Sequence, residues 1–204
     1  HGMKFTVSPG FQERHREEIA ALFWQAFGPK LAPSLGTDAR ALAFIAQGLR
    51  PEFAFSAVTD HGALIGAAGI KTAKGGFFTG NYSDLRALYG TFGALWRGAI
   101  LDQFERPLEE GTLQMDGIFV DEGARGMGVG TALLDAVVWT ARMNRCARVR
   151  LDVVRENARA RALYERYGFE EVGKLRAGIL APLLGFREAA TMAYALAEHA
   201  GDAP

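Results

Sequence analysis

Cysteine is almost absent from this sequence. Its 204 residues include one cysteine, Cys146, so no intramolecular disulfide can form. A zinc site would need several well-spaced histidines beside that thiol, but the four histidines are scattered along the chain (His1, His15, His61 and His199). These absences predict a protein without a metal cofactor. A chain without disulfides is also typical of the reducing cytoplasm, which is the expected location.

Net charge and long hydrophobic runs are absent as well. The 23 Lys and Arg residues balance the 23 Asp and Glu residues, which argues against a general nucleic-acid or membrane-surface binder. The longest charge-free apolar stretch near the C-terminus, residues 177–186, is about half the length of a membrane span and contains Gly178, Pro182 and Gly185. We therefore expect no nucleic acid and no membrane among the partners.

The length of the chain favours one domain. Dividing 204 residues by about 150 per domain gives roughly 1.4, and hydrophobic residues make up 49% of the chain, as in globular proteins. His1 and Gly2 precede Met3 and resemble an expression scar. The predicted domain therefore covers residues 3–204.

Two helices are expected early in the chain. A short strand at 4–8 precedes a stretch, 11–27, in which apolar residues repeat at helical spacing. After a loop that contains Pro33, Thr37 is placed to cap a second helix, which should stop near Leu49.

The middle of the chain predicts a hairpin and then an inserted segment. The aliphatic and aromatic runs 53–60 and 63–71 are separated by His61-Gly62, a typical turn sequence. Residues 72–111 are less regular, and Ser83 is placed to cap one or two short helices. We expect this helical insertion to cover or line a binding pocket.

A β-α-β unit is the clearest pattern in the second half. A strand at 113–120, a helix at 128–144 and a strand at 148–154 follow one another, and the helix carries an apolar stripe that includes Leu133 and Val137. Strands connected in this way are parallel with a right-handed crossover. A short helix at 158–167 and two last strands, 170–173 and 187–196, complete the expected α/β fold.

The turn between the first strand and the helix of this unit is rich in glycine. Gly126, Gly128 and Gly130 fall within five residues, so backbone N–H groups can approach an anion closely at the start of a helix. A phosphate or diphosphate is the expected ligand, and a tight turn that needs glycine only for its geometry is the alternative. The turn has no lysine, which argues against a Walker loop. The dinucleotide-binding pattern G-x-G-x-x-G requires a third glycine at the position of Leu133, so this chain does not match it. Nucleotide binding stays open as an alternative.

The region from Leu113 to Gly173 resembles the core of the GNAT superfamily of acyl-CoA-dependent N-acyltransferases. Arg125, Gly128 and Gly130 fit the family signature of Gln or Arg, two residues, Gly, one residue, then Gly or Ala. Asn157 and the run from Tyr164 to Phe169 are similar to a second family segment. The resemblance implies a mixed, mostly antiparallel twisted sheet of about seven strands flanked by helices. It also implies acetyl transfer from acetyl-CoA to an amine.

The resemblance also implies roles for particular residues. The backbone of the signature turn would wrap the diphosphate of acetyl-CoA, and the strand end Ile118, Phe119 and Val120 would lie beside the pantetheine arm. Tyr164 would donate a proton to the departing thiolate, although its helical spacing with Ala160 also fits a buried core residue. The expected cofactor-binding residues are Ile118, Phe119, Val120, Arg125, Gly126, Met127, Gly128, Val129, Gly130, Thr131 and Asn157.

The general base is open between two carboxylates. A lysine-like amine is only about 0.1% neutral near pH 7.4, so a group must accept its proton. Asp116 shares strand parity with Ile118 and Val120, whereas Asp152 lies on the neighbouring strand. Either carboxylate is alternatively an ion-pair partner of a nearby arginine. Because no histidine neighbours Cys146 in sequence, direct transfer is preferred over an acyl-cysteine intermediate.

Several questions stay open at the level of sequence. The acceptor is a small-molecule amine or an amine of a protein or peptide, and acylation of a hydroxyl on the same scaffold is an alternative. A non-catalytic acyl-CoA-binding or regulatory module is the alternative from a different class. Arg159 or Arg161 is a candidate for the extra phosphate on the CoA ribose, although a solvated helix face is favoured. The protein is expected to be a monomer or a homodimer.

Overall fold

The computed structural model describes residues 3–35, 39–78, 82–101, 108–181 and 187–196. Its strands are β1 (Phe5–Pro9), β2 (Ala54–Thr59), β3 (Leu64–Thr72), β4 (Gly75–Gly76), β5 (Thr112–Val120), β6 (Arg148–Val154), β7 (Glu170–Arg176) and β8 (Glu188–Ala195). Its α-helices are α1 (Arg16–Leu35), α2 (Ala39–Gly48), α3 (Tyr82–Leu101), α4 (Val129–Met143) and α5 (Ala158–Tyr167).

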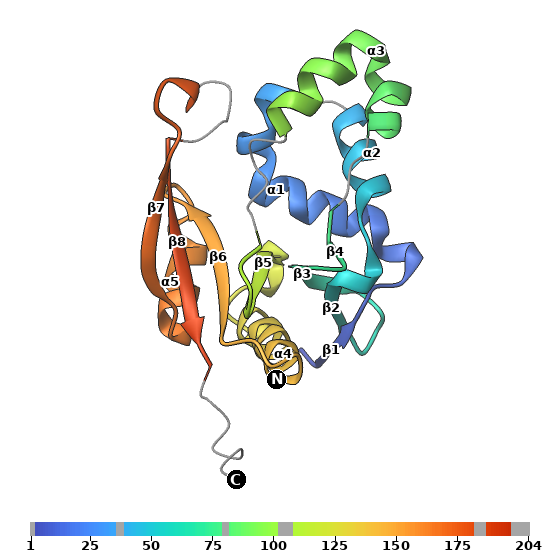
Figure 1. Ribbon diagram of the computed structural model, residues 1–204. Coiled ribbons are helices and arrows are strands. Elements are labelled where there is room, and N and C mark those ends of the chain that lie inside the picture. The colour runs from blue at the N-terminus through green and yellow to red at the C-terminus, as the bar shows by residue number, and fades with distance from the viewer. Residues whose placement is uncertain (1–2, 36–38, 79–81, 102–107, 182–186, 197–204) are drawn as a thin grey trace.

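All these strands belong to one sheet with the order β1-β2-β3-β5-β6-β8-β7, and β4 pairs with β3 (Figure 1). Neighbouring strands are antiparallel except β5 and β6, which are parallel. This arrangement confirms the predicted mixed, largely antiparallel sheet and its parallel junction. The last strand, β8, enters between β6 and β7, so the order of the strands differs from their order in the sequence.

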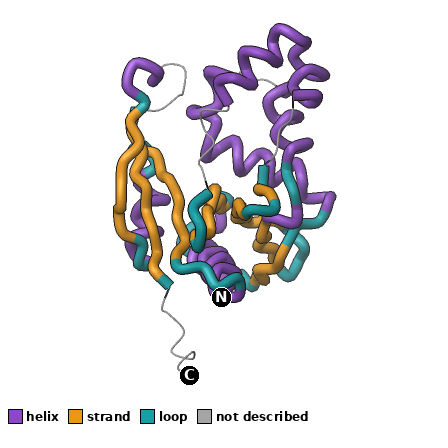
Figure 2. The backbone as a smooth tube through the Cα atoms, viewed as in Figure 1, coloured by secondary structure: helices purple, strands orange, loops and turns teal. Residues whose placement is uncertain are grey.

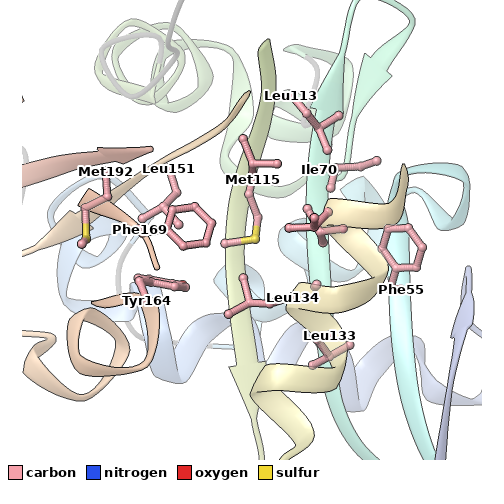
Figure 3. Close-up of a cluster of buried hydrophobic side chains, with 14 of the residues drawn as sticks. Phe55, Ile70, Leu113, Met115, Leu133, Leu134, Leu151, Tyr164, Phe169 and Met192 are labelled. Carbon is pink, nitrogen blue, oxygen red and sulfur yellow. The ribbon is translucent and has the colours of Figure 1, made fainter. Parts of the chain in front are cut away.

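Helices cover both faces of the sheet, and each face has its own apolar core. On one face, α4 buries Leu133, Leu134 and Val137, the predicted stripe, together with residues of α5 and the strands. Figure 3 shows Tyr164 facing this core together with Phe169. The strands in Figure 2 lie between α4 on one side and the group formed by α1, α2 and α3 on the other.

The inserted segment packs on the helical layer. Helix α3 breaks at Gly90, where the backbone has a φ of 77°, and its buried residues Leu85 and Ala94 join the core that α1 and α2 form with the sheet. The prediction of helices within 72–111 is therefore correct. No helix in the described parts of the chain is long and apolar enough to cross a membrane.

Helix α1 differs most from the prediction. It begins at Arg16, after a 3-10 turn at Glu13–His15, and continues to Leu35 instead of ending near Phe27. The expected loop at Pro33 is wrong, because the helix continues through Pro29 and Pro33, although each proline removes one backbone hydrogen bond. Ile19, Leu22 and Phe23 anchor the first half of the helix in the core. The predicted cap Thr37, residues 1–2, residues 182–186 of the last loop and residues 197–204 lie outside the described residues.

Candidate active site

The site begins where β5 and β6 separate. The two strands pair only through Thr112, Leu113 and Gln114, which lie opposite Arg148, Val149 and Arg150. Beyond these pairs β5 runs on to Val120 and β6 to Val154, and in the described sheet the two strand ends do not pair with each other. The sheet therefore opens along its middle, between its halves β1-β2-β3-β5 and β6-β8-β7 (Figure 1).

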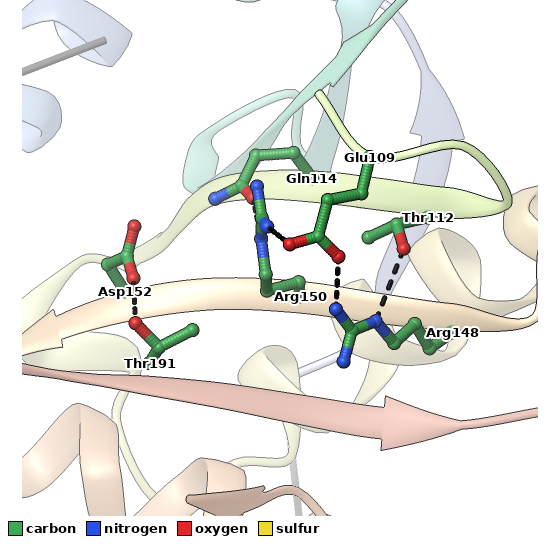
Figure 4. A network of polar contacts seen from close by, with 7 residues as sticks. All are labelled: Glu109, Thr112, Gln114, Arg148, Arg150, Asp152 and Thr191. Atoms are coloured by element: carbon green, nitrogen blue, oxygen red, sulfur yellow. Dashed lines mark hydrogen bonds and ion pairs between the residues drawn. The ribbon is translucent and has the colours of Figure 1, made fainter. Parts of the chain in front are cut away.

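Polar side chains hold the paired end of this junction together (Figure 4). The carboxylate of Glu109 contacts both Arg148 and Arg150. Arg150 Nε also donates to Gln114 Oε1 at 2.7 Å, and Arg148 Nε donates to Thr112 Oγ1 at 3.2 Å. Arg150 is only 4% exposed, so its hydrogen bond to Gln114 is a buried connection between the two strands.

A cavity of about 840 Å³ lies at the open end. Its volume is within the range of small-molecule sites in proteins. The cavity brings together most of the site residues expected from the sequence, from β5, the glycine-rich turn and α5. These are Ile118, Phe119, Val120, Arg125, Gly126, Gly128, Val129, Gly130, Thr131, Asn157 and Tyr164. Of the expected set, Met127 and Asp116 do not line it.

The glycine-rich turn presents unused backbone donors. The N–H of Arg125 bonds to Glu122 O at 3.3 Å, and the N–H of Ala132 bonds to Gly128 O at 3.0 Å. Between them, the N–H groups from Gly126 to Thr131 have no partner within the described chain. Gly128 has a φ of 83°, which favours glycine, and caps α4 without a side chain. Unused N–H donors are suited to an anion, and the positive end of the α4 dipole favours one at the same place.

Tyr164 combines a buried ring with a place on the cavity wall. The residue is 3% exposed, and its ring centroid lies 5.7 Å from that of Phe169. Burial raises the pKa of the Tyr164 phenol above its ordinary value, and a backbone hydrogen bond from Ile118 opposes that shift. The expected core role and a position for chemistry are thus compatible, because the ring packs in the core while the residue also borders the cavity.

A neighbouring tyrosine has a different environment. The hydroxyl of Tyr167 donates to Asp135 Oδ1 at 2.7 Å, which ties α5 to α4. Burial, followed by this hydrogen bond, raises the pKa of Tyr167. Unlike Tyr164, Tyr167 does not line the cavity.

Asn157 caps the N-terminal end of α5 and Gly168 caps its C-terminal end, as the sequence indicates. Asn157 Oδ1 accepts a hydrogen bond from the N–H of Ala160 at 3.2 Å, so the residue is the N-cap, and it also lines the cavity. Gly168 closes the helix with a φ of 121°, and its N–H bonds to Tyr164 O and Glu165 O. The two caps set where α5 begins and ends, and this helix places Tyr164 beside the strand ends.

The alternation used to place Asp116 on the face of Ile118 and Val120 is interrupted in β5. Gly117 pairs with Gly69 and Met115 with Ile70, so Asp116 is an extra residue in β5. Such a bulge breaks the alternation of side chains along a strand. Met115 and Ile118 accordingly pack against the same core, although simple alternation would put them on opposite faces. The other carboxylate, Asp152, accepts a hydrogen bond from Thr191 Oγ1 at 2.7 Å (Figure 4).

Several cavity residues were not expected from the sequence. One group comes from α1 and consists of Leu22, Gln25 and Ala26, and nothing local in the sequence marks them. Glu156 and Arg166 form a second group at α5, beside Arg159, which the sequence had already offered as a candidate for the ribose phosphate. Helical spacing offered a signal for Arg166, because it falls on the side of α5 that carries Arg159 and Leu163.

The inserted segment was expected to cover or line the pocket, and none of its described residues lines it. Helix α3 packs on α1 and α2, and α1 supplies the residues on that side of the cavity. Cys146 also lies away from the cavity, and burial raises the pKa of its thiol, which disfavours the reactive thiolate. Among the described residues, no three His, Cys, Asp or Glu side chains are grouped to hold a metal ion.

Comparisons with known proteins agree with this geometry. A profile of the Acetyltransferase (GNAT) family matches residues 16–169. The chain is 30% identical over 90 residues to a spermine/spermidine N(1)-acetyltransferase of Bacillus subtilis (strain 168). The aligned stretch covers 44% of this chain and 53% of that protein. It is 53% identical over 53 residues to a mycothiol acetyltransferase of Beutenbergia cavernae. This alignment covers 26% of this chain and 18% of that protein.

A solved structure is similar over nearly the whole chain. The GCN5-related N-acetyltransferase from Kribbella flavida superposes with a TM-score of 0.59 at 16% identity, over 94% of this chain and 98% of that one. That likeness shows a shared fold. The sequence matches to the two curated relatives span about half of one and less than a fifth of the other. The profile match extends over most of the chain, which therefore belongs to the acetyltransferase (GNAT) family.

Proposed function

We propose that this protein transfers an acetyl group from acetyl-CoA directly to an amine. One observation carries the proposal: the N–H groups from Gly126 to Thr131 have no partner in the described chain, and all these residues except Met127 border a cavity between two separated strands. Unused donors at a helix N-terminus are suited to a diphosphate. The gap beside β5 is suited to an extended arm, because the unpaired edge of a strand offers further backbone donors and acceptors.

The reaction needs two proton transfers. The neutral amine attacks the thioester carbonyl, the C–S bond breaks, and CoA leaves as a thiolate that takes up a proton. We assign Tyr164 as the donor of that proton, because it lines the cavity and its raised pKa keeps the phenol protonated at neutral pH. The products are an N-acetylated amine and free CoA.

The proton lost by the amine needs an acceptor. We propose Asp116 for this role, acting directly or through water, with Asp152 as the alternative. Support for Asp116 comes from its place on β5 two residues before Ile118, which lines the cavity. Because Asp116 does not itself line the cavity, a bridging water suits the geometry better than direct contact.

Small amines are the first acceptors to test. The named relatives include a spermine/spermidine acetyltransferase and a mycothiol acetyltransferase, so polyamines and a mycothiol-type amine are the leading classes. Leu22, Gln25 and Ala26 border the cavity from α1, on a different side from α5. An acceptor that entered there would meet a mostly apolar wall with one amide.

Two measurements with purified protein test the proposal. Acetyl-CoA should raise the melting temperature, whereas ATP and NAD should not, and one amine in a panel should release free CoA thiol. The panel contains spermidine, spermine, amino acids and a peptide with a free N-terminus. Absence of stabilisation by any acyl-CoA contradicts the proposal. Stabilisation without thiol release for any amine favours the non-catalytic acyl-CoA-binding module.

A further inference from the structure

Three arginine side chains line the cavity of the candidate active site. Arg125, Arg159 and Arg166 all line it, and Glu156 is the one carboxylate among its described lining residues. All three arginines are exposed. The chain as a whole has a net charge of zero, so this excess of positive charge is local. Such a wall is complementary to a ligand that carries several negative charges.

The arginines of α5 fall into two groups. Arg161 is committed to neighbouring carboxylates, with Nε 2.8 Å from Glu165 Oε1 and a second nitrogen 3.4 Å from Glu171 Oε2. Arg159 and Arg166 have no ion-pair partner in the described part of the chain. The two unpaired side chains face the cavity, whereas the paired one does not line it.

Helical geometry brings Arg159 and Arg166 to the same wall. They are seven residues apart, which is about two turns and about 10 Å along the axis. Leu163 lies between them on the same side and also lines the cavity. Arginine side chains are long enough to converge from these positions on one group between them.

The charges of the proposed donor exceed what the turn can match. Acyl-CoA carries a diphosphate and a separate phosphate on its ribose, and a phosphomonoester is close to doubly charged at pH 7.5 because its second pKa is about 6. The N–H groups from Gly126 to Thr131, with Arg125, suffice for the diphosphate. We infer that Arg159 and Arg166 form a separate binding site for the ribose 3′-phosphate, so that the protein distinguishes CoA from 3′-dephospho-CoA.

The inference rests on the proposed function for the identity of the donor, and its test uses binding, so no acceptor is needed. Titration calorimetry would compare CoA with 3′-dephospho-CoA for the wild type, Arg159→Ala, Arg166→Ala and the double variant. We expect the wild type to prefer CoA by about tenfold, and each single variant to weaken CoA binding by about threefold. The double variant should bind both ligands equally. Arg161→Ala is the matched control and should keep the preference.

Each contrary result has a distinct meaning. Equal binding of the two ligands by the wild type overturns the 3′-phosphate site while leaving the proposed donor in place. The same is true if the double variant loses affinity for both ligands by the same factor, because the arginines would then contact a part common to both. Failure of the wild type to bind either ligand overturns the proposed function itself. Both arginines are exposed, and unchanged circular dichroism of the variants would confirm folding.

Discussion

Gly130 and Leu163 bring α4 and α5 together at the wall of the cavity. A Cβ atom on Gly130 would lie 2.7 Å from Leu163 Cδ2, which is closer than van der Waals contact allows. Both residues line the cavity, and Gly130 lies in the first turn of α4. The absence of a side chain at this position therefore sets how closely α5 approaches the donors of the turn.

Replacing Gly130 by alanine should separate stability from ligand binding. The new methyl group must displace the flexible end of Leu163, at a cost of about 1 kcal/mol, while alanine gains up to about 1 kcal/mol in helix propensity. We expect a melting temperature within a few degrees of the wild type, and a Kd for CoA about fivefold higher because Leu163 shifts within the cavity wall. Calorimetry and thermal melts measure the two quantities.

The double variant Gly130→Ala, Leu163→Ala provides the control. Truncating Leu163 removes the atom that the new methyl group would meet, so the affinity for CoA should recover relative to Gly130→Ala alone. If Gly130→Ala binds CoA as tightly as the wild type, the close approach has no role in binding.

Tyr164→Phe should abolish most of the turnover and leave donor binding intact. Loss of a general acid typically lowers kcat by about 10² to 10⁴, and the ring remains to pack against Phe169. Because burial raises the pKa of Tyr164, the phenol stays protonated up to its ordinary pKa of about 10 and beyond. The wild-type rate should therefore show no decline from this group between pH 7 and 9, as a pH–rate profile would measure.

Tyr167→Phe is the matched control for that substitution. It removes the hydrogen bond to Asp135, so we expect a loss of about 1 kcal/mol in the free energy of unfolding with little change in kcat. The folded chain holds the Tyr167 proton more tightly than the unfolded chain. This stabilisation is complete below the unfolded pKa of about 10 and is lost as pH rises through the folded value. An equal loss of kcat in both variants would contradict the role of Tyr164.

Asp116→Asn and Asp152→Asn distinguish the two candidate bases. The variant that lacks the base should lose the rise of kcat/KM with pH and about 10² or more in rate at neutral pH. We expect this result for Asp116→Asn. Thr191→Val controls for the hydrogen bond to Asp152 by removing its donor. If only Asp152→Asn loses the pH dependence while Thr191→Val keeps it, Asp152 is the base.

Gln114→Leu should weaken the junction of the two strands. The substitution removes an acceptor from the buried guanidinium of Arg150, at a cost of about 1–3 kcal/mol. The urea midpoint should fall with an unchanged m-value. Thr112→Val, which removes the weaker 3.2 Å contact to the half-buried Arg148, should cost less. Equal midpoints for the two variants would show that Gln114 contributes no special stability.

Local sequence patterns predicted those parts of the candidate site that are formed by residues close together in the sequence. The turn from Arg125 to Thr131, the cap Asn157 and the terminator Gly168 lie as expected, because capping and positive φ depend on neighbouring residues. The bulge at Asp116 could not be read in this way. It depends on the pairing of β5 with β3, which lies more than forty residues earlier in the chain.

The sequence by itself determined the β-α-β unit, its glycine-rich turn and the family, since these follow from periodicity and from a few residues at fixed spacing. Tertiary structure alone decided that β8 enters between β6 and β7, that β5 and β6 separate after Gln114, and that α1 borders the cavity. It also decided that Arg161 of α5 reaches Glu171 of β7. The physical reason is that contacts between distant segments depend on how whole elements pack, and no local spacing encodes that packing.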